Sequence, residues 1–116
     1  MSKNPIGIFD SGIGGLTIAH AIKIKLPNES LIYFGDTKHL PYGEKSEQAI
    51  KDYSLKIADF LKNNNCKAIS IACNSASSVA YYHIKKNINS IPIYNVIDPV
   101  VSFISKKYFN KKIGVI

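Results

Sequence analysis

A single thiol, Cys73, occupies the position in this sequence that is best suited to chemistry. The apolar residues 68–72 are typical of a strand, and small polar residues, with Asn74 and Ser75 first, then begin a predicted helix. Free backbone N–H groups and the helix dipole at such a helix start favour the thiolate over the thiol. Open α/β sheets bind ligands where their strands end. Cys73 is therefore the candidate base or nucleophile of this chain.

A glycine-rich loop, residues 10–15, follows the first predicted strand and begins with Asp10 and Ser11. Its glycines would let backbone N–H groups approach a ligand closely, and Asp10 adds a carboxylate. A dinucleotide fingerprint would need glycine where Thr17 stands, although Asp36 after the second strand could act as its ribose-binding acid. The nucleotide interpretation therefore stays open, as does a purely structural turn in which Asp10 caps the next helix.

A third loop, residues 36–43, ends in the rigid turn Pro41-Tyr42-Gly43, which offers an aromatic hydroxyl and a backbone N–H. His39 lies in the same loop and is predicted to be a surface residue. Because parallel strands end at one edge of a sheet, the three loops are expected to share one rim.

In their order along the chain, these segments resemble glutamate racemase. The resemblance is carried by residues 8–17, by residues 33–37 with the turn 41–43, and by residues 72–76, and it extends from about Ile6 to the end of the chain. The glycine-rich loop and the Pro-Tyr-Gly turn separate the chain from the aspartate and hydantoin racemases.

The resemblance implies a cofactor-independent proton transfer at Cα of glutamate between two cysteines on opposite faces of the substrate. It implies an enzyme that supplies D-glutamate for peptidoglycan. Cys73 matches the first cysteine, and Asp10 matches the acidic residue beside it, which we expect to orient the thiol or manage protons. Ser75 stands where the family usually has threonine. The positions that match substrate-binding ones are Asp10, Ser11, Pro41, Tyr42, Gly43, Asn74 and Ser75.

Along the whole chain, apolar patterns and turn residues predict an alternation of strands and helices. This alternation favours an α/β fold, with an open parallel sheet and helices on both faces. Strands are predicted at residues 5–10, 30–35, 67–72 and 91–97, and helices at 13–26, 46–62, 75–86 and 98–109. Asp98 and Pro99 predict the cap and first position of the last helix.

The last residues, 112–116, predict the start of a fifth strand with no helix after it. We therefore expect an amino-terminal racemase domain at residues 1–97, followed by a connecting helix and the first strand of an incomplete second domain at 98–116. The second catalytic cysteine and its neighbouring histidine are absent from the sequence, and His20 and His83 fall on predicted helices. The chain alone is therefore predicted to be inactive.

The composition of the chain disfavours some classes of binding partner. The net charge is +7, but all 15 basic residues are lysine, and without arginine a nucleic-acid partner is disfavoured. No apolar stretch approaches the ~20 residues of a membrane span, and the first residues lack a signal peptide, so a cytosolic chain is expected.

Cys66 and Cys73 flank a predicted strand, about 20 Å apart and beyond disulfide reach. No metal-binding spacing occurs, and a homodimer is left open.

Two functional alternatives remain beside the racemase. The chain could be a non-catalytic half-domain that binds carboxylates, or part of another amino-acid racemase of the superfamily, such as an aspartate racemase. A thiol hydrolase that uses Cys73 as nucleophile is disfavoured, because the sequence offers it no plausible histidine partner.

Overall fold

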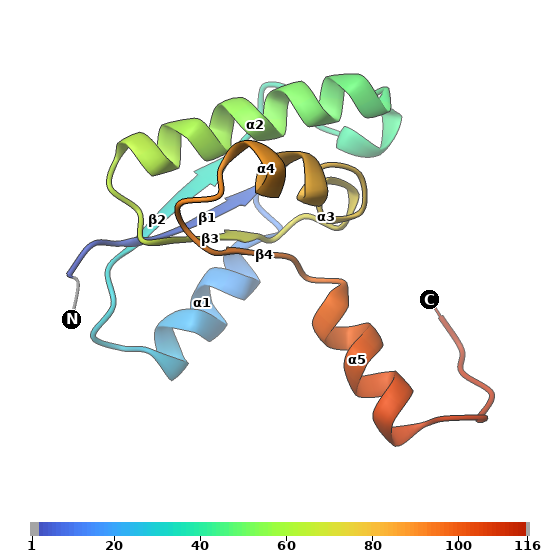
Figure 1. The fold of residues 1–116 in the computed structure, drawn as a ribbon. Coiled ribbons are helices and arrows are strands. Elements are labelled where there is room, and N and C mark those ends of the chain that lie inside the picture. Colours follow the sequence, from blue (N-terminus) through green and yellow to red (C-terminus); the bar gives the residue numbers. More distant parts are fainter. Residues whose placement is uncertain (1–2, 116) are drawn as a thin grey trace.

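The computed structural model describes residues 3–115, and its centre is a parallel sheet (Figure 1). Four strands are hydrogen-bonded in the order β2-β1-β3-β4. Their bounds are Ile6–Asp10 for β1, Leu31–Gly35 for β2, Ala68–Ile71 for β3 and Ile93–Tyr94 for β4. In register, Asp10 lies opposite Gly35, and Phe9 lies opposite Ile71. The first three strands therefore end together, and the loops that follow them share one edge, as predicted.

Helices cover both faces of this sheet, which confirms the predicted fold class (Figure 1). Helix α1 lies on one face, and α2, α3 and α4 lie on the other. The helices are α1 (Leu16–Lys25), α2 (Glu47–Asn63), α3 (Asn74–Val79), α4 (Tyr81–Asn87) and α5 (Asp98–Lys107), with a short 3₁₀ turn, η1, at Tyr42–Glu44.

The hydrophobic core lies between the sheet and helices α2 to α4. Phe9, Ile69 and Ile71 contribute from the strands, and Leu61 and Ile84 from the helices, and all five are fully buried. Helix α1, by contrast, has no fully buried residue. The face that carries α2 therefore supplies most of the apolar burial, which is the main favourable term in folding.

The predicted fifth strand is not present in residues 112–115, and Ile116 lies outside the described residues. A strand needs a neighbouring strand to satisfy its backbone N–H and C=O groups. This segment follows α5, which projects away from the sheet (Figure 1). It has no strand beside it and is exposed. The division into two domains remains a prediction.

Three local predictions were also wrong in detail. The helix predicted at residues 75–86 is divided into α3 and α4 at Ala80, a turn residue with φ −109° and ψ −7°. The strand predicted at 91–97 pairs over only two residues. Helix α5 is not capped by Asp98: the Oδ1 atom of Asn95 accepts hydrogen bonds from the backbone N–H groups of Ile97 and Asp98.

Candidate active site

Cys73 lies in the turn between β3 and α3, as predicted. Its backbone is still extended (φ −104°, ψ 129°), and its Sγ accepts a hydrogen bond from the backbone N–H of Ala76 at 3.5 Å. The residue thus caps the first turn of α3 with sulfur in the place of the usual oxygen. It is 6% exposed, so the thiol is sheltered but lines a cleft that solvent reaches.

Asp10 ends β1, and its carboxylate is fixed by the loop that it begins. The Oδ2 atom accepts the backbone N–H of Gly15 at 2.8 Å, and the Tyr33 hydroxyl lies 3.5 Å away. The same hydroxyl donates to the Gly12 carbonyl at 3.0 Å. A side chain at Gly15 would place its Cβ 2.7 Å from that of Asp10, so only glycine permits this approach. Asp10 therefore caps the loop and also faces the cleft.

One open cleft of about 500 Å³ brings the loops together. Six of the eight predicted site residues line it: Asp10, Ser11, Pro41, Cys73, Asn74 and Ser75. Gly12, Ile13, Gly14, Leu40 and Ala72 complete the wall. These further residues belong to the same rim loops. Gly12 and Gly14 lie in the loop whose glycines were expected to approach a ligand, whereas the types of Ile13, Leu40 and Ala72 gave no signal. The wall contains one thiol and one carboxylate among small polar groups, and no lysine.

Tyr42 and Gly43 are not part of this wall. The Tyr42 side chain is 1% exposed, and its hydroxyl donates to Oδ2 of Asp36 at 2.6 Å. Burial first, and then this hydrogen bond, raise the pKa of Tyr42 far above its ordinary value. Gly43 borders an adjoining hollow that also includes Asn74 and Ser75. The Tyr42 hydroxyl is thus directed into the protein, although the turn that carries it borders the cleft.

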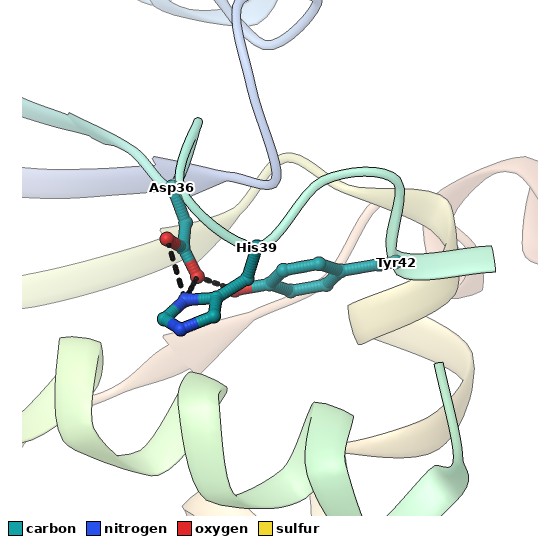
Figure 2. A network of polar contacts seen from close by, with 3 residues as sticks. All are labelled: Asp36, His39 and Tyr42. Carbon is teal, nitrogen blue, oxygen red and sulfur yellow. Dashed lines mark hydrogen bonds and ion pairs between the residues drawn. The ribbon is translucent and has the colours of Figure 1, made fainter. Parts of the chain in front are cut away.

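Asp36 is the centre of a polar network that was not predicted (Figure 2). Besides the Tyr42 hydroxyl, the Nδ1 atom of His39 lies 2.9 Å from both carboxylate oxygens. The His39 ring in turn stacks on Tyr53 of α2. The Asp36 carboxylate is therefore bound by side chains of its own loop. The His39 ring, predicted to lie at the surface, contacts both this carboxylate and a side chain of α2.

Tyr33 does not line the cleft, but its hydroxyl contacts Asp10, and sequence reasoning did not predict this contact. Burial first, and then the charge of Asp10, raise the pKa of the Tyr33 hydroxyl above its ordinary value. The hydroxyl therefore remains a hydrogen-bond donor. The one sequence signal for this contact was the position of Tyr33 near the end of β2, where it lies opposite Ile8 of β1, two residues before Asp10.

The described residues contain no group of three His, Cys, Asp or Glu side chains that could hold a metal ion. Both cysteines are free thiols. Cys66 lies in the core between α2 and β3, and burial raises its pKa. No helix in this part of the chain is long and apolar enough to cross a membrane.

The fold and the cleft define an α/β protein with a thiol and a carboxylate at one edge of a parallel sheet. A scan against protein-family models gives no match. Glutamate racemase of Aquifex pyrophilus is 49% identical over 111 residues, which are 96% of this chain and 43% of that protein. Glutamate racemase of Corynebacterium diphtheriae is 47% identical over the whole chain and 43% of that protein.

Solved structures of glutamate racemases are also similar to this chain. The Aquifex pyrophilus glutamate racemase structure matches with a TM-score of 0.88 and 46% identity, over 93% of this chain and 42% of that one. The Francisella tularensis enzyme, solved with D-glutamate, matches with a TM-score of 0.87 and 43% identity, over 91% and 40%. The chain is similar to the glutamate racemases and spans about two fifths of the length of these relatives.

Proposed function

We propose that this chain is the first catalytic half of a glutamate racemase. The observation that supports this most directly is the shared cleft of Cys73 and Asp10 in a chain 49% identical to a named glutamate racemase. The proposed reaction interconverts L- and D-glutamate by moving a proton at Cα, without a cofactor. The product would supply D-glutamate for peptidoglycan in the cytoplasm.

Cys73 is proposed to act as acid and base on one face of the substrate. As thiolate it takes the Cα proton, and the electron pair of the broken C–H bond passes into the substrate carboxylate group. A second thiol on the opposite face then gives a proton back to Cα. Proton abstraction beside a carboxylate needs a positioned base and donors for the developing negative charge. The sheltered Cys73 sulfur and the backbone N–H groups of the rim loops supply these needs.

The other cleft residues are proposed to hold glutamate and to manage the proton. The Asp10 carboxylate is fixed through its Oδ2 atom, so it can orient the substrate ammonium or the thiol without moving. Ser11, Asn74 and Ser75 offer short polar side chains to the substrate carboxylates, and Pro41 closes the wall. The main-chain N–H groups of Tyr42 and Gly43 are proposed to contribute in place of the Tyr42 hydroxyl, which binds Asp36.

The test of the role of Cys73 uses the protein encoded by the complete reading frame. Cys73→Ser should lower kcat for glutamate racemisation by roughly a thousandfold or more, because a hydroxyl is a far weaker base than a thiolate. Circular dichroism of the reaction mixture follows the two enantiomers. The matched control is Cys66→Ala, which removes the core thiol and should leave kcat within about threefold. Near-normal turnover by the serine variant would overturn the assignment.

The 116-residue chain alone should not racemise glutamate. Its other thiol, Cys66, is buried in the core and does not line the cleft. The same assay, run on this chain free of longer enzyme, checks this, and measurable turnover would contradict it. Two further results would separate the alternatives: preference for aspartate would indicate another racemase, and a complete reading frame without a second cysteine followed closely by histidine would favour a binding module.

A further inference from the structure

The rim loop between β2 and η1 contains a buried carboxylate, Asp36, that the proposed reaction does not use. Asp36 is 7% exposed and does not line the cleft with Cys73. Burying a charge is costly unless it is paired and hydrogen-bonded. Its contacts therefore show what the charge does for the fold.

All the side-chain partners described for Asp36 lie in its own loop. The Tyr42 hydroxyl donates to Oδ2 at 2.6 Å, and Nδ1 of His39 is 2.9 Å from each oxygen (Figure 2). Residues three and six positions downstream are thus tied back to the first residue of the loop. The two residues between them, Leu40 and Pro41, are the ones that line the cleft.

The network is anchored at both ends. The backbone N–H of Asp36 donates to the Asp10 carbonyl at 2.9 Å, which joins the network to the end of β1. On the other side, the His39 ring stacks on Tyr53 of α2, with centroids 3.9 Å apart and planes 14° from parallel. Lys38 and Lys56 border the outer face of the network beside Asp36. The loop is therefore held between the sheet edge and α2.

We propose that Asp36 is a positioning residue that holds Leu40 and Pro41 in place in the wall of the cleft that Cys73 also lines. The inference rests on the proposed function. Asp36 does not touch the reacting atoms, so its effect reaches the reaction through the wall. Loss of the carboxylate should loosen substrate binding and uncover the Cys73 thiol, with little effect on the proton-transfer step.

The test is Asp36→Asn in the protein encoded by the complete reading frame. The amide keeps the size of the carboxylate but offers one acceptor oxygen, and its N–H donors face His39 or Tyr42. We expect KM for glutamate to rise about tenfold with kcat within about threefold, and Cys73 to be alkylated by iodoacetamide at least about threefold faster. The control is Asp59→Asn, the same change on the exposed side of α2, which should change neither quantity.

Tyr42→Phe is the second variant, in case the asparagine variant fails to fold. It keeps the buried ring and removes only the hydroxyl that donates to Asp36, and it should raise KM and the alkylation rate in the same direction. Unchanged KM and unchanged alkylation in the folded variants would overturn the proposal, as would a fall in kcat alone. If the parent protein does not racemise glutamate, the proposed function fails, and the alkylation rates alone judge the role of Asp36.

Discussion

The two thiols of this chain lie only seven residues apart, yet their surroundings differ in kind. Cys73 caps α3 and lines the cleft. Cys66 is enclosed in the core against Leu61 and Gly7, where a Cβ added to Gly7 would lie 3.0 Å from its sulfur. Reactivity of a cysteine follows its thiolate fraction and its access to reagents. The two residues should therefore report on different parts of the molecule.

We expect iodoacetamide at pH 7.5 to modify Cys73 at least about tenfold faster than Cys66. Burial raises the pKa of Cys66, so its thiolate forms only at a higher pH than that of an exposed cysteine, and the core excludes the reagent. Mass spectrometry of the digested chain measures both rates. In urea the two rates should converge, and equal rates in the folded chain would contradict the assigned positions.

At the scale of the elements, helices α2 and α5 differ in how they are attached. Ile50, Ile57, Ala58 and Leu61 of α2 are buried, whereas α5 has no buried residue. A polar side chain accepts backbone N–H groups at the start of each helix. The Oγ atom of Ser46, the N-cap of α2, accepts the Ala49 N–H at 3.1 Å, whereas Asn95 lies two residues before the N-cap of α5 and accepts the N–H groups of Ile97 and Asp98. Loss of these hydrogen bonds should therefore matter globally at α2 and locally at α5.

Ser46→Ala should lower the free energy of unfolding by about 1 kcal/mol, the usual cost of a lost cap. Asn95→Ala is the matched variant, and it should leave the urea midpoint of the chain unchanged because α5 contributes little to the buried core. Urea titrations followed by circular dichroism measure both. Equal shifts of the midpoint in the two variants would show that α5 unfolds together with the sheet.

At the scale of the whole molecule, two of the tightly buried ionisable groups hold their protons more strongly in the folded chain than in the unfolded one. Burial is the first cause of the raised pKa of both Tyr42 and Cys66. As the pH rises past 9 to 10, the unfolded chain loses these protons first. Each group therefore makes its full contribution to the free energy of unfolding below that range. Above it the contribution declines by up to about 1.4 kcal/mol per pH unit for each group.

Tyr42→Phe should flatten this alkaline decline. At pH 7.5 the variant should be less stable by about 1.5–3 kcal/mol, because the Asp36 carboxylate loses a donor. Between pH 9 and 11 the difference from the parent should shrink, since only the parent has the Tyr42 proton to lose. Urea midpoints at intervals of pH measure the difference, and lysine titration is common to both proteins. A difference that is constant across this range would contradict the linkage.

The sequence by itself determined the order of strands and helices and, to within one residue, the ends of β1, β2 and β3. It did so because apolar periodicity and turn residues act locally. The same local signals placed Asp10 and Cys73 at strand ends and Pro41 in the loop after β2, and parallel strand ends meet at one edge. Six of the eight predicted residues thus line the cleft. The break at Ala80 and the missing fifth strand were not predicted, because packing of helices and pairing of strands depend on distant neighbours.

Only the tertiary structure decided which way the rim side chains face. Tyr42 carries a hydroxyl that suits a ligand as well as a buried partner, and no local pattern distinguishes the two. The structure brings it to Asp36, six residues earlier, within 2.6 Å. His39 was assigned to the surface for the same reason, since its stacking on Tyr53 joins a loop to a helix. Contacts between elements depend on how all side chains pack together in the core, and this packing is not encoded in any local segment of the sequence.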